Sequence, residues 1–448
     1  MGQTNYFIKK VFIIITIFLL ICLLIIKVRP PKADRSIPAP LGPLLVCPSK
    51  ISDQTITPLK NTKHLLVSAF MDQRVIGFDI RIIGMFRRDS IQPLNCLFCC
   101  VGHLGGTTPT KILVHILYSG FPFVATDIMC QIPQNCDATH VTLLTEPRVE
   151  NERNLTWIPI RNKKTNENNE RMNFTVCISS LFGEYNNVLQ YTQSLEMYRL
   201  LGVNRVVIYN TSCGPDLDRL LQSYTQEGFV EIVPWPINEH LNSSHGWHFS
   251  KHGGDIHYFG QLATLNECMY RYMERSRYVL LNDVDEIIMP YQHNNLMSLM
   301  DTLQNQHPDV GVFRIENHIF PKEHFEPSGR FHLPQWNGVP GVNILEHIYR
   351  EDPDINRYHP LKLIVQPRMV EQTSVHLAVR RFGQQYKVPR DVCRVIHVRA
   401  PLQGSIKLEQ LHVDKRLWDF QEKLIPNVDK VLKKVGMLAS PPVNTSQE

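Results

Sequence analysis

The stretch from Tyr278 to Pro290 constrains the fold more than any other part of the chain. An apolar run, Tyr278 to Leu281, leads through Asn282 into three carboxylates at positions 283, 285 and 286, after which the chain turns apolar again. This pattern is typical of a buried strand whose end emerges into a polar site. Because successive side chains of a strand alternate between its faces, we expect Asp283 and Asp285 to point the same way and to share one divalent cation.

The Asp-x-Asp pattern alone is weak evidence, since it recurs in the chain and any short motif arises by chance. It occurs at Asp216/Asp218, Asp283/Asp285 and Asp352/Asp354. The first pair follows Pro215 at the expected start of a helix, where acidic residues are favoured, and the last flanks Pro353 in a polar loop. Only the middle pair closes an apolar strand, where ligands bind in open α/β sheets. We therefore predict a metal site there that holds the diphosphate of a nucleotide-sugar. Carboxylates that cap a turn or helix are the alternative.

The length of 448 residues allows about two or three domains. A hydrophobic content of 43% with 20% charged residues is ordinary for a globular protein. The formal net charge of +5 is modest, and no concentrated basic stretch stands out. We therefore expect no nucleic-acid partner.

An apolar segment near the start predicts a membrane anchor. Residues 11–26 contain Thr16 as their one polar residue and are bracketed by lysines. A cleaved signal peptide is the alternative, but no small-residue cleavage site follows. Potential N-glycosylation sequons all lie after this segment, which favours a type II, single-pass protein with a lumenal body. They begin at Asn154, Asn173, Asn210, Asn242 and Asn444.

Cysteine usage agrees with an oxidising compartment. The chain has eleven cysteines, and all but Cys22 lie after the apolar segment. Their even number there permits disulfides without dictating the pairing. Cys96, Cys99 and Cys100 could also form half of a zinc site, but no matching pair follows at the usual spacing, so we expect disulfides or buried thiols.

Composition divides the chain into segments. We predict a cytoplasmic tail over 1–10, the membrane-spanning signal-anchor over 11–26 and a proline-rich stem over 27–60. Short β-like runs predict a β-rich accessory domain over 61–160, and a polar linker over 161–172 follows. The main domain is expected over 173–425, with a C-terminal tail over 426–448.

Strands and helices alternate in the main domain. The expected strands are Phe174–Ser179, Arg205–Tyr209 and Phe229–Val233, and the expected helices are Val188–Leu201, Leu217–Tyr224 and Gln261–Met273. Alternation with short connections predicts an α/β fold with a Rossmann-type sheet, parallel or mixed, wound on both faces. A nucleotide would lie at the carboxyl edge of its strands.

Several motifs in order resemble glycosyltransferase family 92. They are Cys177–Gly183, Leu200–Tyr209, Tyr224–Gly228, Trp235-Pro236, Gly260-Gln261 with Cys268, and Asp283–Glu286. The resemblance spans roughly residues 174–399. It implies a GT-A fold, a type II Golgi membrane protein and inverting, manganese-dependent transfer from a UDP-sugar, usually UDP-galactose. Members of the family add β-linked galactose to glycans, including core fucose on N-glycans and pectic galactan.

Under this hypothesis Asp283 and Asp285 bind Mn²⁺ or Mg²⁺. An imidazole commonly completes such a site, and we place His397 first and His376 second as the further ligand. A histidine satisfied in the core or at the surface is the alternative for both. The family typically has His-Tyr-Arg where this chain has His397-Val398-Arg399.

Other residues receive roles with open alternatives. Lys362 or Arg399 could neutralise the donor phosphates, or be ordinary solvated cations. Inverting transfer needs a general base, for which Glu346 and Asp352 are the candidates, and the sequence does not choose between them. Trp235, Trp247 and Trp336 could serve as platforms for sugar rings, with loop anchoring as the alternative.

We therefore predict a membrane-anchored, metal-dependent glycosyltransferase that moves a hexose, galactose by resemblance, from a UDP-sugar to an N-glycan or another oligosaccharide. The competing hypothesis is a non-catalytic, membrane-tethered glycan-binding protein that retains the fold. A nucleotidyltransferase is disfavoured, because the loop Ser179–Glu184 has one glycine and no basic residue.

Overall fold

The computed structural model describes residues 47–48, 50–115, 120–146, 155–163, 171–353, 361–401, 404 and 406–438. The predicted cytoplasmic tail and signal-anchor, and the stem up to residue 46, lie outside these residues. Within the described part of the chain, no helix combines the length and apolar character needed to cross a membrane. Apart from the boundary at residue 425, which is described below, the segment boundaries predicted above stay predictions.

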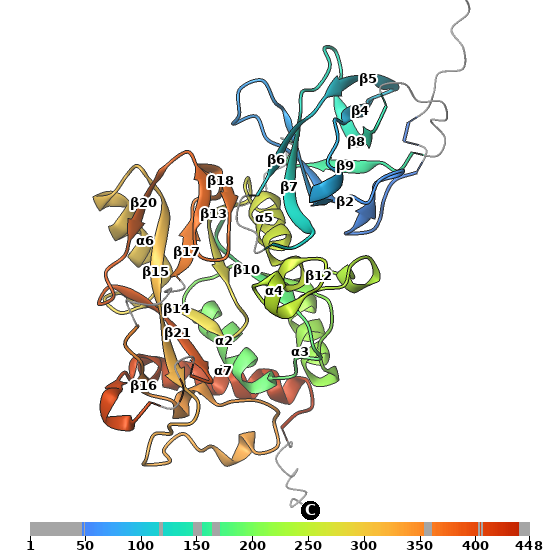
Figure 1. The fold of residues 1–448 in the computed structure, drawn as a ribbon. Helices are drawn as coiled ribbons and strands as arrows, with labels where there is room; N and C mark the ends of the chain where they lie inside the picture. Colours follow the sequence, from blue (N-terminus) through green and yellow to red (C-terminus); the bar gives the residue numbers. More distant parts are fainter. Residues whose placement is uncertain are drawn as a thin grey trace, which may run out of the picture. The chain divides into compact units, whose positions relative to one another are not determined.

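The first part of the described chain forms a nine-stranded sheet (Figure 1). Its order is β5-β4-β8-β9-β2-β3-β7-β6, with β1 paired to β2. All described pairings in it are antiparallel except that of β2 with β9. The strands are β1 (Thr57–Pro58), β2 (Leu65–Met71), β3 (Ile80–Arg87), β4 (Asn95–Cys100), β5 (His103–Pro109), β6 (Lys111–Val114), β7 (Phe123–Cys130), β8 (Ala138–Leu144) and β9 (Ile158–Arg161).

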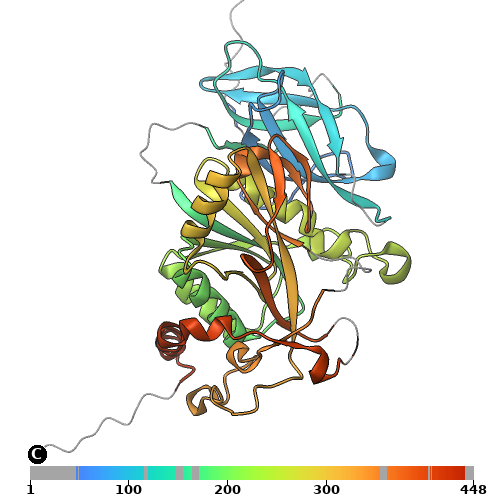
Figure 2. The same ribbon diagram turned by 90° about the vertical axis from the view of Figure 1, so that its left-hand side faces the viewer.

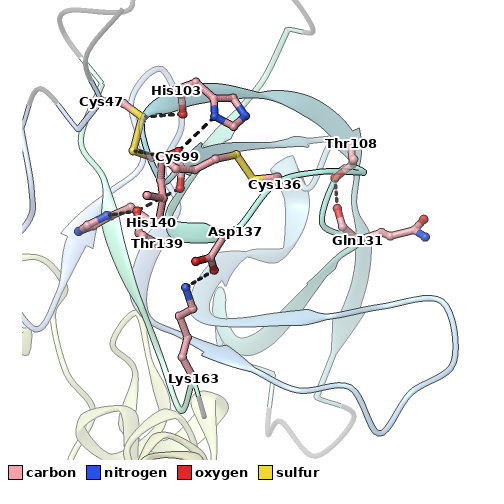
Figure 3. Close-up of a disulfide and its surroundings, with 12 residues drawn as sticks. Cys47, Cys99, His103, Thr108, Gln131, Cys136, Asp137, Thr139, His140 and Lys163 are labelled. Carbon is pink, nitrogen blue, oxygen red and sulfur yellow. Dashed lines mark hydrogen bonds and ion pairs between the residues drawn. A yellow bond between two sulfur atoms is a disulfide. The ribbon is translucent and has the colours of Figure 1, made fainter. Parts of the chain in front are cut away.

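Disulfides cross-link this sheet and the segments beside it. Cys47 is bonded to Cys99, and Figure 3 shows this bridge beside the Cys136 bridge at the same end of the sheet. The pairs in this sheet are Cys47–Cys99, Cys96–Cys130 and Cys100–Cys136. The cysteines that the zinc alternative would need are therefore all used in disulfides. Cys47 and β1 of the expected stem therefore both attach to this sheet.

The second nine-stranded sheet is mixed, with the order β12-β11-β10-β13-β17-β15-β21-β14 and β20 paired to β15. Strands β10, β11, β12 and β13 run parallel to one another, whereas β17 is antiparallel to both β13 and β15. The strands are β10 (Met172–Leu181), β11 (Arg205–Asn210), β12 (Val230–Pro234), β13 (Ser276–Asn282), β14 (Glu286–Pro290), β15 (Val310–Pro321), β17 (Leu361–Val365), β20 (Gln384–Lys387) and β21 (Cys393–Arg399). Two small sheets pair β16 (Tyr349–Arg350) with β22 (His412–Val413), and β18 (Val370–Thr373) with β19 (Ala378–Arg381).

Helices cover both faces of this sheet (Figure 2). Side chains of β10 alternate accordingly: Phe174, Val176 and Ile178 pack with the core of α2, α3, α6 and α7, whereas Cys177 packs with α5 on the other face. Helix α5 also packs on β2 and β3 of the first sheet, so one apolar core joins the two sheets. The helices are α2 (Val188–Leu200), α3 (Pro215–Gln226), α4 (Phe249–His252), α5 (Gln261–Arg271), α6 (Leu296–Gln306) and α7 (Gln421–Lys434).

The last helix differs from the expected C-terminal tail. Helix α7 runs across the boundary that we placed between residues 425 and 426. Its buried side chains Leu424, Val428 and Leu432 belong to the core shared with α2. Apolar residues at this helical spacing bury one stripe of the helix, so the chain stays part of the main domain beyond residue 425.

The long strand β15 pairs with a different neighbour along each half of its length. Its first half, up to Glu316, pairs antiparallel with β17, and its second half, from Glu316 to Pro321, pairs parallel with β21. Strand β14 then pairs with β21 at the edge. The chain therefore leaves β13 in the centre of the sheet, makes a three-residue turn and continues at the far edge, with the acidic residues in that turn.

Candidate active site

The acidic pair lies in a turn and not within a strand. Strand β13 ends at Asn282 and β14 begins at Glu286, so our argument from alternation along a strand was wrong for Asp283 and Asp285. Both residues nevertheless line one cavity of about 290 Å³. The turn brings them there because it begins at the carboxyl end of β13, beside the end of β10.

Residues from three parts of the chain line this cavity. Ser179 to Phe182 come from the end of β10, Asp283 to Asp285 from the turn, and His397, Arg399 and Ala400 from the end of β21. Tyr258 closes a further side. The carboxyl ends of β10, β13 and β21 therefore meet at one polar site, as expected for an α/β sheet.

Lys362 supplies a buried cation under the turn. It lies on β17, and only 1% of its side chain is exposed. Its Nζ is 2.6 Å from Asp283 Oδ2 and 2.9 Å from Glu286 Oε2. Burial disfavours the charged form, but these two carboxylates outweigh burial and raise the pKa of Lys362. Its contacts are with carboxylates, and a role toward donor phosphates stays a prediction.

His397 joins the acidic turn because of strand pairing. The antiparallel register of β14 and β21 sets Glu286 opposite His397. The imidazole Nε2 lies 3.1 Å from Asp285 Oδ2, and Nδ1 lies 3.3 Å from Glu286 Oε1. Asn317 donates from Nδ2 to Glu286 Oε1 at 2.8 Å, which fixes that carboxylate beside the ring. Burial disfavours the imidazolium, but Asp285 and Glu286 outweigh it and raise the pKa of His397.

The electrostatics keep Asp285 ionised. Burial alone would raise the pKa of Asp285, but the neighbouring His397 and Arg399 outweigh burial and lower it to about 2. Glu286 is buried more deeply, and burial raises its pKa despite the Lys362 ammonium. The two carboxylates therefore differ in their surroundings. Asp285 is an anion that faces the cavity, and Glu286 contacts Lys362 and His397 in the interior.

The donor set fits a divalent cation in its chemistry. Ligand atoms held at right angles about 2.1 Å from one cation lie roughly 3 Å apart, as Asp285 Oδ2 and His397 Nε2 do. Nε2 faces Asp285, and its lone pair would be available to a cation when the proton lies on Nδ1, which is 3.3 Å from Glu286 Oε1. Among the described residues, no three His, Cys, Asp or Glu side chains are already arranged around a common metal position, and Asp283 is paired with Lys362.

His376 contacts another part of the site. Its Nδ1 lies 3.1 Å from the carbonyl oxygen of Leu361, and its ring stacks on Trp247 with centroids 5.9 Å apart. Burial and the neighbouring Lys362 lower the pKa of His376 to about 4. The neutral ring is therefore the form present near neutral pH, and its role as a metal ligand stays a prediction.

The general-base candidates lie elsewhere. Neither Glu346 nor Asp352 belongs to the described residues that line the cavity. Glu346 is 3.2 Å from His332 Nδ1, and Asp352 is held by Arg350 and His412 at 2.8 Å each. Either residue as base stays a prediction.

The structure brings further polar residues to the site. Gln261, the first residue of α5, donates to Ser179 Oγ at 2.9 Å and to Asp283 Oδ1 at 3.2 Å. No sequence signal pointed to Asn317. It lies on the long strand β15, and its contact with Glu286 depends on the pairing of distant strands.

The three tryptophans separate by burial. Trp235 and Trp336 are buried, and each ring N–H donates a hydrogen bond, to the Phe259 carbonyl and to Asp429 respectively. Trp235 and Trp336 therefore anchor loops, which was the alternative to a role as platforms for sugar rings. Trp247 is 39% exposed and lies beside Tyr258 of the cavity.

Comparison with known proteins identifies the class. A family model that covers residues 172–435, more than half of the chain, defines it as a glycosyltransferase. That model describes glycosyltransferase family 92, and the chain belongs to this family. The matched segment contains the mixed sheet and every residue of the site described above.

Relatives are distant. The chain is 26% identical over 203 residues to glycosyltransferase family 92 protein F13G3.3 of Caenorhabditis elegans, which covers 45% of this chain and 37% of the relative. It is 22% identical over 268 residues to beta-1,4-galactosyltransferase galt-1 of the same organism, over 58% of this chain and 56% of the relative. The chain therefore spans less than two thirds of the length of either relative.

Solved structures give weaker matches. Mannosyltransferase PcManGT from Pyrobaculum calidifontis, in complex with GDP-Man and Mn²⁺, is 12% identical with a TM-score of 0.27, covering 63% of this chain and 81% of that one. The UTP-bound UGPase of Acinetobacter baumannii is 9% identical with a TM-score of 0.24, covering 59% and 96%. TM-scores this low bear on neither fold nor function.

Proposed function

We propose that this glycosyltransferase transfers galactose from UDP-galactose to a glycan acceptor, with inversion, on a GT-A fold and with Mn²⁺ or Mg²⁺ bound. The observation that carries the proposal is the arrangement of Asp285, His397 and Glu286 at the carboxyl edge of the mixed sheet. The name of the galt-1 relative supports galactose as the donor sugar. Segments 1–10 and 11–26 would serve as cytoplasmic tail and type II anchor in the Golgi, with the rest of the chain lumenal.

The side chains divide the task. Asp283, Asp285 and His397 would hold the cation, which as a Lewis acid stabilises the departing UDP. Glu286 and Asn317 hold the His397 ring in place, so that Nε2 stays directed at Asp285. Arg399 lines the cavity and offers positive charge to the donor phosphates. Lys362 keeps the carboxylates of Asp283 and Glu286 together before the donor arrives.

A panel of UDP-sugars tests this proposal. We would measure sugar release and transfer by the purified full chain with Mn²⁺ or with EDTA, for the wild type and for Asp285→Ala. Asp301→Ala is the matched control, because that aspartate is exposed on α6. We expect metal-dependent turnover of UDP-galactose that Asp285→Ala reduces at least about 100-fold, the usual cost of losing a preorganised electrostatic contact.

The second candidate is a glycan-binding protein without catalysis. One observation favours it: Asp283 is already neutralised by Lys362, an arrangement that is complete without a cation. No turnover of any donor, with the wild type and Asp285→Ala alike failing to bind UDP, would move this candidate to first place.

A further inference from the structure

Trp247 is an exposed aromatic ring at the edge of the candidate active site. Its indole stacks on Tyr258, with centroids 5.4 Å apart and planes 23° from parallel. His257 packs against it edge-on at 4.5 Å, and His376 stacks at 5.9 Å. A large apolar ring that stays 39% exposed among such neighbours offers its free surface to a ligand.

Tyr258 connects this ring to the catalytic carboxylates. It lines the cavity together with Asp283, Asp285 and Arg399. Burial, and then Asp283 and Asp285, raise the pKa of its phenol, which agrees with a position beside these anions. Trp247 therefore lies one ring away from the proposed transfer site.

The backbone that carries Tyr258 is strained. Tyr258 has φ 38° and ψ 62°, and Phe259 has φ 53° and ψ 28°, so two successive non-glycine residues adopt the left-handed conformation. Each such residue costs about 1 kcal/mol or more, and strain of this kind is concentrated at functional sites. The surroundings enforce it: Phe182 stacks on Phe259 at 4.0 Å, and the Trp235 ring N–H donates to the Phe259 carbonyl oxygen at 2.8 Å.

The first sheet supports the same loop. The backbone N–H of Phe123 on β7 donates to the Asp255 carbonyl oxygen at 2.9 Å, and Phe121 packs edge-on against both Phe249 and His257. These contacts hold the segment after Trp247, and before it the backbone N–H of Ser244 donates to the Ile256 carbonyl oxygen at 3.0 Å. A preorganised aromatic surface loses little entropy when a ligand stacks on it.

We propose that Trp247, backed by Tyr258, forms the subsite for the acceptor sugar, a hexose whose apolar C–H face stacks on the indole and whose hydroxyl points toward Asp285. This inference rests on the proposed function. A separate polar cavity of about 590 Å³ follows the ends of β10, β11 and β12 and would leave room for the nucleoside of the donor, because Gly183, Ser212 and Asn238 line it and Trp247 does not.

Steady-state kinetics of Trp247→Ala and Trp247→Phe test the subsite. With released N-glycans and a galactan oligosaccharide as acceptors, we expect Trp247→Ala to raise the acceptor KM about three- to ten-fold. Trp247→Phe should restore most of the loss. UDP affinity and acceptor-independent hydrolysis of UDP-galactose should stay within about two-fold of the wild type. Phe325→Ala is the control, since that ring is also exposed, at 58%, and packs on His347 instead.

Two kinetic outcomes would decide against the subsite. An unchanged acceptor KM in Trp247→Ala would overturn it, and so would a loss of UDP affinity with the acceptor KM retained, because the ring would then bind the nucleobase. If the wild type turns over no donor, the proposed function fails separately, and binding of the same oligosaccharides by calorimetry replaces the kinetics. Glycan binding that Trp247→Ala abolishes would then support the platform, and no binding by the wild type would overturn it.

Discussion

At the scale of residues, the site is built around a buried ammonium group. Lys362 forms two short ion pairs, with Asp283 and Glu286, and Glu286 also faces His397. Charges this deep are stable only while each keeps its partner. The lysine therefore holds the carboxylates of Asp283 and Glu286 together, and we expect its substitution to affect stability.

We predict that Lys362→Met lowers the free energy of unfolding by roughly 3–5 kcal/mol, because Glu286 would remain buried without its cation. Urea denaturation with EDTA present measures this. The control is Lys387→Met, which removes a lysine that is 57% exposed and 2.8 Å from Glu316, and it should cost less than about 1 kcal/mol. Equal losses in the two variants would contradict the prediction.

The sequence located part of this site for physical reasons. Asp283, Asp285, His397 and Arg399 all follow apolar runs, and the ends of such runs mark the polar edge of a sheet. The position of Lys362 under the turn depends on β17 pairing with β13, which periodicity does not reveal. Glu346 and Asp352 were chosen by their place in the chain, and their ion pairs with His332, Arg350 and His412 could not be foreseen.

At the scale of elements, the parallel half of the sheet was predictable and the other half was not. Strands β10, β11 and β12 alternate with α2 and α3, so local periodicity reveals them. Strand β14 follows β13 in the chain but pairs with β21 at the sheet edge. Such a pairing depends on contacts between segments about a hundred residues apart. It also requires that β15 pair with β17 along its first half and with β21 along its second half.

Helix α5 ties the site to the core, and a disulfide fixes it. Cys268 of α5 is bonded to Cys177 of β10, and the same helix begins with Gln261, which contacts Asp283. We predict that the double variant Cys177→Ala/Cys268→Ala lowers the free energy of unfolding by roughly 2–4 kcal/mol, the usual cost of losing a native disulfide.

Thermal denaturation under non-reducing conditions measures this loss, with Cys213→Ala as control because Cys213 is a free, partly buried cysteine. That control should change the free energy of unfolding by less than about 1 kcal/mol. If the double variant and the control have the same melting temperature, the disulfide between α5 and β10 does not stabilise the native state.

At the scale of the whole molecule, a buried ionic network joins the first sheet to the main domain. Arg81 of β3 has no exposed side-chain surface and contacts Asp72, Asp127 and Glu371, at 2.9, 2.6 and 2.9 Å. Glu371 belongs to β18, so this guanidinium links the first sheet to the main domain. Arg74 adds hydrogen bonds to the carbonyl oxygens of residues 367, 368 and 370.

We predict that Arg81→Met destabilises the protein by roughly 3–5 kcal/mol, because it strands buried carboxylates on both sides of the junction. Arg87→Met is the control, since Arg87 forms an exposed pair with Asp89 and contributes little. Calorimetry should show both variants as folded proteins, with a large loss in melting temperature for Arg81→Met only.

The same network gives the protein a defined response to acid. Burial alone would raise the pKa of Asp127, but His115 and Arg81 outweigh burial and lower it to about 2. This folded-state pKa lies below the ordinary value of 3.8, so the unfolded state binds the proton more tightly. The stabilisation is complete above about pH 4 and is lost as the pH falls toward 2, at a cost of roughly 2 kcal/mol. Urea denaturation at pH 6 and at pH 3 should therefore show a larger loss in the free energy of unfolding for the wild type than for Asp127→Asn, which no longer titrates.

Asp137→Asn is the matched control, because Asp137 is exposed and pairs with Lys163 at the surface. A wild-type stability with the same pH dependence as that of Asp127→Asn would mean that the junction does not hold this carboxylate in its charged form.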